Sequence, residues 1–567
     1  MRRLHGLRLA FFGDPAGFMD RLPEPFRTLG LLELTAATWI ASRVTARPHW
    51  RSVTGTALAA AFDARGDLLA AALAPGVLRL ETPPARIEVL GGEATVEPWN
   101  PWSLYRDRRR AGETRAQALK AAWPEHGPRY LPGRDAPFGP PADAAYRAWL
   151  ARTAPPPADL PTGAPAQDFV AGGRLVEGAS ARLAEAFADP AVRMVYADED
   201  RTDGQGEPCG PVFKTAFDAV RLERQDYIGQ AFAVRPDLAA GGLDARRIAP
   251  ELPAGSVRHI PLVLWRRAQA QAWPVEAPPP AQASPSVRVI VPTRDRADLL
   301  AACAAGVLER TDGAPDLCVV DNGSVEPAAL TLLEALAARP RVQVLRIDGP
   351  FDFPALNNQA AADATAEVLV FLNDDTWVVE PGWLQEMTAL AMRPDVGAVG
   401  AKLSYPDGRL QHAGVALGLG AHGVAGHPFR GAPGTMDGPQ AMLRVVREVS
   451  AVTGACLAVQ RSKFAAVGGF DPALKVAFND VDLCLRLAMR GWKTVWTPHA
   501  RLVHLESASR GSPEATAEKA VRLRQEAALM HDRWGARLAA DPYYHPALSL
   551  EGERWALGEE LRSTAPR

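Results

Sequence analysis

The segment EVLVFLNDDTWVVEPGWL, residues 367–384, joins an apolar run directly to a cluster of acids. Positions 368–372 are all apolar, which predicts a buried β-strand. The run stops at Asn373-Asp374-Asp375. Pro381 then stands where the first turn of a helix tolerates proline, so we expect a helix over 381–392. Strand, acids and helix together indicate one unit of an α/β fold.

Segments before this unit repeat the alternation. Expected helices follow the expected strands in turn, and the six elements are 287–291, 297–310, 317–320, 327–339, 342–347 and 354–365. Nearly continuous apolar strands that alternate with helices predict a mostly parallel sheet covered on both faces. Sheets of this kind bind ligands at the carboxyl ends of their strands.

Polar residues follow three of these strands. Pro292-Thr293-Arg294-Asp295 comes after the first strand and Asp321 after the second. We expect Asp321 to accept from a nucleobase or ribose, and the amides around Thr293, with Arg294, to meet phosphate. Asn373-Asp374-Asp375 offers the hard oxygen ligands that suit Mg²⁺ or Mn²⁺ bound jointly with a diphosphate. One such cluster is also typical of turns and caps, but three in succession predict a metal and diphosphate anchor.

Residues 284–510 resemble a family 2 glycosyltransferase of the GT-A fold. The segments that carry this resemblance stand in the family's order, and they are VRVIVPTRDR (287–296), CVVDNGS (318–324), FDFPALNNQAA (351–361), FLNDDTWVVEPGWL (371–384), AVTGACLAVQRSKFAAVGGFDP (451–472), FNDVDLCLRLAMRGWKTVWTP (478–498) and LVHLESASRG (502–511). The resemblance implies that Asn373-Asp374-Asp375 is the metal-binding DXD element, with Asp375 and Asp374 as ligands and Asn373 beside the donor. It also implies that His504 reaches the metal or the diphosphate, although a lone histidine after a strand is equally a structural residue.

The resemblance places the catalytic base at Asp480. The pattern of residues 478–491 independently predicts an amphipathic helix that starts at the acids, because Val481, Cys484, Leu485 and Ala488 form an apolar stripe. The positive helix end favours an ionised carboxylate, as a general base requires. The alternatives are that Asp480 only caps the helix and that Asp482 pairs with Arg486 one turn on.

Further residues match the acceptor side of the family. They are Gly454, Ala455, Gly469 and Asp482, where glycines let a sugar ring approach the backbone. Asp198-Glu199-Asp200 ends an earlier apolar strand and resembles the back half of a second such domain. We expect this part to be a degenerate remnant that binds no donor and packs on, or extends, the acceptor groove.

These observations divide the chain into a series of regions. The expected order is a β-rich module of unknown role (1–130), the GT-A-like remnant (131–272), a proline-rich linker (273–286), the catalytic domain (287–512) and a C-terminal helix and tail (513–567). Another proline-rich piece, 153–167, predicts a linker or a surface crossing. The tryptophans of the first module are expected to be core residues rather than a sugar-stacking platform.

Bulk composition limits the classes of binding partner and the compartment that we expect. Lys and Arg total 63 against 65 Asp and Glu, so no nucleic acid is expected as a partner. The five cysteines are scattered without CxxC spacing, which favours a reducing compartment. No apolar run approaches the roughly 18 residues that span a bilayer. We therefore expect a cytoplasmic protein, with the inner face of the membrane as the place for any peripheral contact.

The expected function is an inverting, metal-dependent glycosyltransferase. Mn²⁺ or Mg²⁺ would hold a nucleoside-diphosphate sugar, and the acceptor would be a glycan or a lipid-linked saccharide in surface polysaccharide biosynthesis. One alternative is a catalytically inactive glycan-binding scaffold with the same fold. A sugar-1-phosphate nucleotidyltransferase is the other, but the sequence has no glycine-rich phosphate loop at its start or after Val291.

Overall fold

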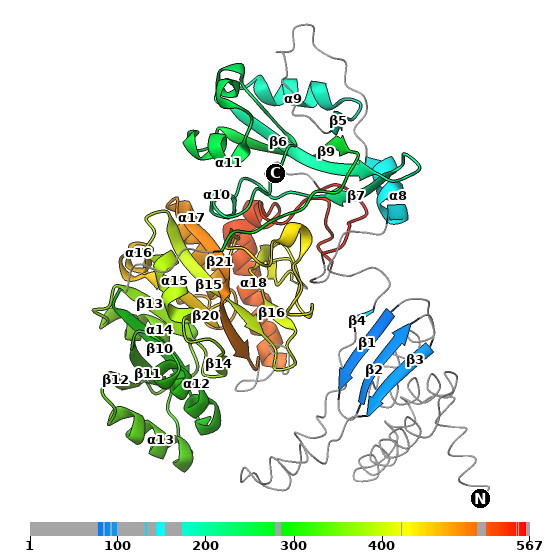
Figure 1. Ribbon diagram of the computed structural model, residues 1–567. Coiled ribbons are helices and arrows are strands. Elements are labelled where there is room, and N and C mark those ends of the chain that lie inside the picture. The colour runs from blue at the N-terminus through cyan, green and yellow to red at the C-terminus, as the bar shows by residue number, and fades with distance from the viewer. Residues whose placement is uncertain are drawn as a thin grey trace, which may run out of the picture. The chain divides into compact units, whose positions relative to one another are not determined.

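The structure is a computed structural model that describes residues 77–82, 85–90, 93–98, 131–132, 143–153, 173–277, 285–420, 422–506, 517–551, 553 and 555–562. The chain forms two compact units, Met1–Pro137 and Phe138–Arg567 (Figure 1). The first unit contains an antiparallel sheet with the order β3-β2-β1-β4, whose strands are Val77–Thr82 (β1), Ala85–Leu90 (β2), Glu93–Pro98 (β3) and Leu131–Pro132 (β4). The five tryptophans of the predicted first module, residues 154–167 of the first proline-rich piece and residues 278–284 of the linker lie outside the described residues.

The second unit is built on a ten-stranded sheet. Its main path runs β12-β11-β10-β13-β20-β15-β21-β14, with β16 paired to β15 and β19 to β21. The strands are Val287–Thr293 (β10), Asp316–Asp321 (β11), Val342–Arg346 (β12), Val368–Leu372 (β13), Thr376–Val378 (β14), Val396–Ser404 (β15), Leu410–His412 (β16), Arg447–Glu448 (β19), Cys456–Gln460 (β20) and Lys493–His504 (β21). A separate two-stranded sheet joins Ala416–Leu417 (β17) to Ala425–Gly426 (β18).

The strand directions bring distant segments to one edge of this sheet. β10, β11, β12 and β13 pair in parallel, so their carboxyl ends share that edge. β20 runs antiparallel to β13 and pairs Cys456 with Leu372, so the residues just before β20 lie beside the acid cluster. β14 pairs antiparallel with the end of β21, which places His504 opposite Thr376.

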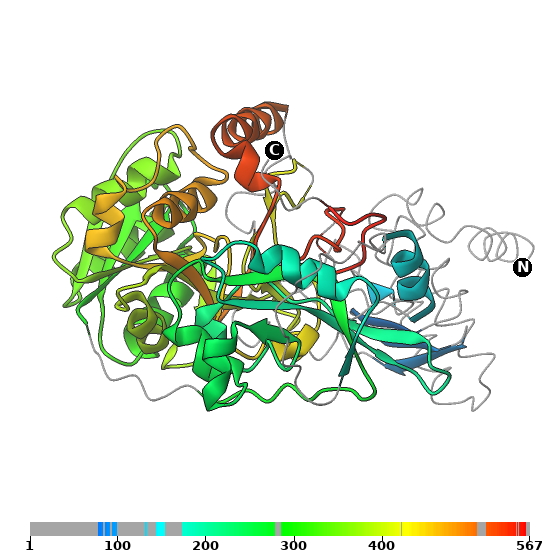
Figure 2. The same ribbon diagram turned by 90° about the horizontal axis from the view of Figure 1, so that it is seen from above.

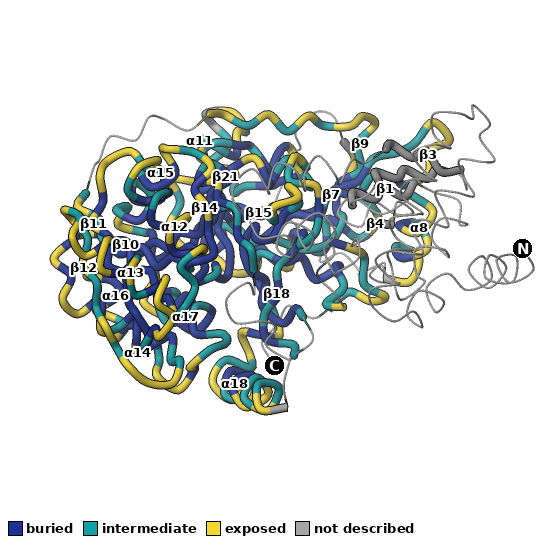
Figure 3. Tube along the Cα trace, turned by 90° about the horizontal axis from the view of Figure 1, so that it is seen from below, coloured by how far each residue is buried: buried dark blue, intermediate teal, exposed yellow. Residues whose placement is uncertain are grey.

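Helices cover this sheet and bury its apolar residues. They are Ala297–Glu309 (α12), Pro327–Ala337 (α13), Phe353–Ala362 (α14), Trp383–Ala391 (α15), Arg461–Ala466 (α16), Asn479–Met489 (α17) and Ala517–Leu538 (α18), with a short 3-10 turn at Pro439–Ala441 (η3). Asp352 caps α14 by accepting from the amide of Ala355, as a helix N-cap does. All five residues of β13 are buried, and Figure 3 shows the inner strands of the sheet in dark blue.

A smaller sheet precedes this one in the same unit. Its order is β5-β9-β6-β7, with β8 also paired to β6, and only the β6 and β9 pair is parallel. The elements are Asp143–Thr153 (α8), Gly173–Leu175 (β5), Ala179–Phe187 (α9), Met194–Thr202 (β6), Pro208–Val212 (β7), Ala219–Leu222 (α10), Phe232–Val234 (β8), Pro236–Gly241 (η1), Ala245–Ile248 (α11), Ala249–Glu251 (η2) and Val257–Arg267 (β9). Figure 2 shows the larger sheet with its helices, this smaller sheet and α18 from above.

Two further findings concern membrane-spanning helices and cysteines. Among the residues that the structure describes, no helix is both long enough and apolar enough to cross a membrane. The five cysteines, Cys209, Cys303, Cys318, Cys456 and Cys484, are free and buried.

Candidate functional site

A pocket of about 290 Å³ opens at the carboxyl ends of β10 and β13. Six of the predicted donor residues line it, and they are Pro292, Thr293, Arg294, Asp295, Asn373 and Asp374. The Thr293 hydroxyl donates to Asp374 Oδ2 at 2.7 Å, so Asp374 is held against the β10 end. Phe351 and Phe353 also line the pocket, and the sequence analysis did not assign them to it.

Asp295 and Asp321 are both engaged by the protein. Asp295 accepts from the amides of Val325 and Glu326, and these bonds lower the pKa of its carboxyl. Asp321 does not line the pocket and is only 1% exposed. It accepts from the amide of Ser324 at 2.9 Å and from Arg346 at 3.0 Å. A direct contact between Asp321 and a nucleoside base therefore requires Arg346, whose side chain is half exposed, to move aside.

Asp375 and His504 form the centre that could hold a metal. The carboxylate Oδ1 of Asp375 lies 3.1 Å from Nε2 of His504, and the Asn373 amide lies 3.4 Å from the same ring atom. Asp375 is 2% and His504 5% exposed. Nδ1 of His504 has no hydrogen-bond partner among the described residues, so the ring's polar contacts gather at Nε2. The Asp375 carboxylate and the His504 imidazole are groups that could hold a divalent metal, whereas the Asn373 atom that faces the ring is the side-chain nitrogen Nδ2.

Asp480 stands in the first turn of α17 and contacts the segment that borders the acid cluster. Its Oδ2 accepts from the amide of Gly454 at 2.8 Å, and its Oδ1 from the amide of Val481 at 2.8 Å. The next residue, Ala455, accepts from the amide of Asn373 at 3.0 Å. Gly454 and Ala455 thus link the predicted base to the predicted metal element. Burial raises the pKa of Asp480, and the Gly454 and Val481 amides offset part of that rise.

Gly454 is a glycine because of close packing. A Cβ there would lie 3.2 Å from the Phe353 ring and 3.6 Å from Cβ of Asp480. Since Phe353 lines the donor pocket, Gly454 keeps Asp480 close to that pocket. The role first suggested for this glycine was approach by a sugar ring, whereas here protein side chains crowd it.

Gly469 and Asp482 do not fit the acceptor side in the same way. Gly469 has φ of +72°, and a Cβ there would lie 2.6 Å from Asn358 Oδ1, so the glycine serves packing against α14. Asp482 is fully buried, and its assignment to the acceptor side stays a prediction. It accepts from Arg486 at 2.7 Å, as the alternative predicted, and from Arg533 and Trp534 of α18 at 2.6 and 3.0 Å. It ties α17 to α18.

A pair of histidines that the sequence analysis did not identify lies in the same unit. Nδ1 of His412, on β16, is 3.0 Å from Nδ1 of His427. Burial, followed by the neighbouring His427, lowers the pKa of His412 well below its ordinary value. Burial likewise lowers the pKa of His427. His427 lies beyond a glycine-rich loop, so no periodicity of the sequence predicts that it meets His412.

The acids that end β6 are paired with cations. Asp200 accepts two bonds from Arg266, both at 2.8 Å, and one from the hydroxyl of Tyr146 at 2.8 Å. Glu199 accepts from Arg267 at 2.5 Å. The two arginines come from the end of β9, and they occupy the acids that would otherwise attract a cation. The expectation that this part of the chain binds no donor of its own stays a prediction.

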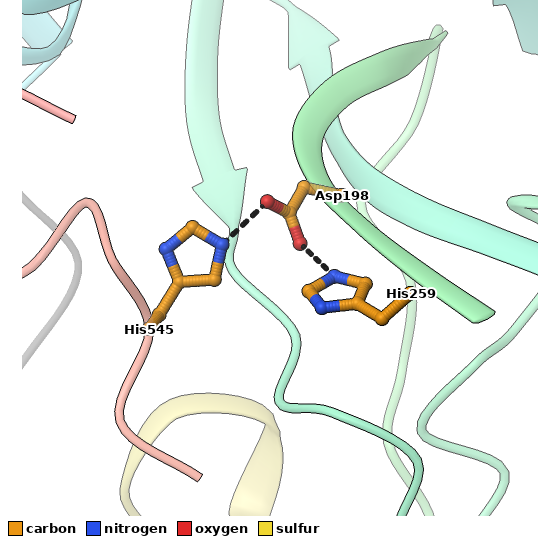
Figure 4. Close-up of side chains that lie close together, drawn as sticks. All are labelled: Asp198, His259 and His545. Carbon is orange, nitrogen blue, oxygen red and sulfur yellow. Dashed lines mark hydrogen bonds and ion pairs between the residues drawn. The ribbon is translucent and has the colours of Figure 1, made fainter. Parts of the chain in front are cut away.

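Asp198 lies between two histidines (Figure 4). Within the described ranges, Asp198, His259 and His545 are close enough together to be considered as metal ligands. Nδ1 of His545 accepts from the amide of Ala547 at 3.0 Å, so Nε2 carries the ring proton and donates it to Asp198 at 2.7 Å. A metal on Nε2 would have to displace that proton, so the chemistry favours a hydrogen bond from His545 to Asp198 over metal binding.

The hydrogen bond between His545 and Asp198 joins the C-terminal segment to β6. His259 Nε2 lies 3.0 Å from Asp198, and the amide of Lys214 donates to the same carboxylate at 2.9 Å. Burial alone would raise the pKa of Asp198, but His545 and His259 outweigh burial and hold that pKa well below its ordinary value. The carboxylate is therefore ionised and holds His545 against β6.

Comparison with known proteins supports the family predicted above. The sequence model described as "Glycosyl transferase family 2" matches residues 288–417. The N-acetylglucosaminyl-diphospho-decaprenol L-rhamnosyltransferase of Mycobacterium tuberculosis is 30% identical over 224 residues, which are 36% of this chain and 71% of that protein. The chain belongs to glycosyl transferase family 2. The predicted family and the GT-A type of α/β fold are confirmed.

Two longer relatives match more of this family 2 glycosyltransferase. O-antigen biosynthesis protein RfbC of Myxococcus xanthus is 35% identical over 432 residues, covering 66% of this chain and 33% of that protein. Protein y4gI of Sinorhizobium fredii is 47% identical over 299 residues, covering 51% of this chain and 32% of its own length. This chain thus spans about a third of each. The solved mannosyltransferase PcManGT of Pyrobaculum calidifontis matches with a TM-score of 0.33 at 18% identity, over 45% of this chain and 66% of that one.

Proposed function

We propose that this family 2 glycosyltransferase is an inverting, metal-dependent enzyme. It transfers a sugar from a nucleoside-diphosphate donor to a glycan or lipid-linked saccharide in surface polysaccharide biosynthesis. The observation that carries the proposal is the link through Gly454 and Ala455, which holds Asp480 beside Asn373 and the donor pocket. The named activities of the rhamnosyltransferase and of RfbC are consistent with such a substrate class.

The donor pocket supplies the groups that bind a diphosphate. Arg294 lines it with a half-exposed side chain, and Thr293 orients Asp374 at its wall. Asp375 and His504, with Asn373 beside them, would hold the divalent metal. A bound divalent cation neutralises charge that develops on a departing diphosphate.

Asp480 acts as the general base in this proposal. Its carboxylate takes the proton of an acceptor hydroxyl, which attacks the anomeric carbon from the face opposite the diphosphate. A raised pKa suits this role, because it makes the carboxylate a stronger base toward the acceptor hydroxyl. A single displacement with one base needs no covalent intermediate and inverts the anomeric configuration.

The stereochemical course is the experiment that tests this function. The protein is incubated with Mn²⁺ or Mg²⁺, a panel of UDP, dTDP and GDP sugars and candidate saccharide acceptors, and the product is followed by proton NMR. We expect the first-formed product to carry the anomeric configuration opposite to that of the donor. Retention of configuration would contradict the single-displacement assignment.

The inactive glycan-binding scaffold makes a different prediction. It binds saccharides but releases no nucleoside diphosphate from any donor in the presence of metal and acceptor. The contact of Asp375 with His504 and that of Asp480 with Gly454, next to the donor pocket, support the enzyme over the scaffold.

A further inference from the structure

A second pocket, of about 270 Å³, lies away from the donor pocket at the carboxyl end of β6. The residues that matter for its chemistry are Glu199, Arg267, Gln271, Trp273, Gln440 and Trp555. They come from the smaller sheet, from the segment that follows β9, from η3 and from the C-terminal segment. The volume is near the lower end of the range for small-molecule sites, which is roughly 300 to 1,000 Å³.

Three buried polar atoms on residues of this pocket have no hydrogen-bond partner within the described ranges. They are Glu199 Oε1, Arg267 Nη2 and Gln271 Oε1. Glu199 is 1% exposed, and Lys214 Nζ stands 3.6 Å from its Oε1, which is too far for a hydrogen bond. A buried polar atom that stays unsatisfied destabilises the fold. Three of them around one cavity point to a ligand with its own donors and acceptors.

Gly229 makes the room in which two of these groups lie. Its φ is +64°, and a Cβ there would be 2.9 Å from the Gln271 amide and 3.2 Å from Arg267 Nη2. A residue with a side chain at position 229 would push both groups from their places. The backbone is thus shaped around the orphaned groups, as expected for a built site rather than for a packing defect.

The polar groups of the pocket do not match a divalent cation or a free phosphate. Glu199 pairs with Arg267 and Asp200 with Arg266, and Arg201 also lines the wall, so a divalent cation gains no net opposite charge. The orphaned acceptors Glu199 Oε1 and Gln271 Oε1 need hydrogen-bond donors, which an ionised phosphate lacks. The three orphaned groups are one carboxylate acceptor, one amide acceptor and one guanidinium donor. The indole rings of Trp273 and Trp555 line the same pocket.

We propose that this pocket binds a neutral saccharide unit. Hydroxyl groups of the sugar complete the hydrogen bonds of Glu199, Arg267 and Gln271, and its apolar face packs on an indole ring. The site is non-catalytic and goes beyond the proposed transfer reaction, since it requires no chemistry at Asp480. It gives the remnant a use in holding a glycan.

Direct binding measurements test this site. Methyl glycosides of D-glucose, D-mannose, N-acetyl-D-glucosamine and L-rhamnose are titrated into the full chain by calorimetry and by saturation-transfer NMR. The variants are Gln271→Ala and Trp273→Ala, which remove a partly exposed acceptor and a ring face, with Asp480→Asn as the matched control in the other site. Thermal melting checks that each variant is folded.

The proposal predicts that at least one glycoside binds wild type and Asp480→Asn equally. Its affinity should fall at least about tenfold in both pocket variants, while metal-dependent donor turnover by Gln271→Ala stays at the wild-type level. Binding of none of the four probes would overturn the proposal, as would equal binding to every variant. A crystal structure that shows only ordered water at Glu199 Oε1 and Gln271 Oε1 in the presence of the bound probe would also overturn it. Failure of donor turnover with intact probe binding would count against the transferase alone.

Discussion

Nε2 of His504, the last residue of β21, lies 3.1 Å from Oδ1 of Asp375, which stands in the turn just before β14. The pairing of β14 with the end of β21 brings them together. The corresponding acid at the end of β6, Asp200, meets Arg266 instead. An imidazole can bind a metal and a guanidinium cannot. Asp375 therefore has a neighbour that could share a metal ion with it, whereas Asp200 has a neighbour that only pairs with its charge.

Replacing His504 tests the metal site. We expect His504→Gln to weaken Mn²⁺ binding at least about tenfold, since even the loss of an outer-sphere partner of a metal ligand costs 10- to 100-fold. Calorimetric titration with Mn²⁺ measures the change, with exposed His531→Gln as the matched control. Unchanged Mn²⁺ affinity with a lower melting temperature would assign His504 a structural role alone.

The arginine at the remnant's acid pair is predicted to be structural. Arg266→Met leaves the fully buried Asp200 carboxylate without its bidentate partner. The free energy of unfolding should fall by about 3 to 5 kcal/mol. In the double variant Asp200→Asn/Arg266→Met part of that loss should return, because the buried charge is gone.

Denaturant titration measures both effects of that cycle. Arg182→Met, which removes an exposed pair with Glu185, is the control and should change stability by less than about 1 kcal/mol. If Arg266→Met lowered the free energy of unfolding no more than Arg182→Met does, the pair of Arg266 with Asp200 would not stabilise this part of the protein.

The His412 and His427 pair predicts a pH dependence of stability. Burial lowers the pKa of both side chains in the folded protein, so between the folded and the unfolded pKa the unfolded chain binds more protons. The stabilisation is present above the ordinary histidine pKa of 6.5 and is lost as the pH falls below it.

The corresponding measurement compares unfolding at pH 7.5 and pH 5.5. We expect His412→Asn to lose less stability over this range than wild type, by roughly 1 kcal/mol, whereas His531→Gln should behave as wild type does. Equal slopes for wild type and His412→Asn would show that the pair is not kept neutral by folding.

Acid sensitivity of catalysis is predicted from Asp480. Because burial raises the pKa of this carboxyl, the acid limb of the pH profile of kcat/KM should have its midpoint above the ordinary aspartate value of 3.8. Rates are lost as the pH falls through that midpoint, since the protonated acid cannot accept a proton. A rate that stays constant down to pH 4 would argue against Asp480 as the base.

Local features of the sequence predicted the four parallel strands β10 to β13 of the larger sheet and the helix that begins beside Asp480. The apolar runs at 287–291 and 368–372 and the stripe after Asp480 depend only on neighbours in the chain, and the structure places β10, β13 and α17 there. Whether an acid at a strand end faces a histidine or an arginine depends on the register of a distant strand. For that reason Arg266 and Arg267 could not be assigned from the sequence.

Asp482 has one contact that the sequence predicts and two that it does not. Its pairing with Arg486 follows from helical spacing and was one of the predicted alternatives. Its contacts with Arg533 and Trp534 depend on how α18 packs against α17, and they bury the side chain completely. The link from Asp480 through Gly454 and Ala455 to Asn373 likewise exists only because β20 is antiparallel to β13.

Donor turnover by Asp480→Asn is the most direct test of the central claim. Wild type, Asp480→Asn and the exposed control Asp532→Asn are incubated with a nucleotide-sugar panel, saccharide acceptors and Mn²⁺ or Mg²⁺, with and without EDTA, and released nucleoside diphosphate is assayed. We predict release from one donor that requires metal, is retained by Asp532→Asn and falls roughly 100- to 10,000-fold in Asp480→Asn. Turnover in folded Asp480→Asn equal to wild type would contradict the assignment of the base, and no release from any donor by folded wild type would favour the glycan-binding scaffold.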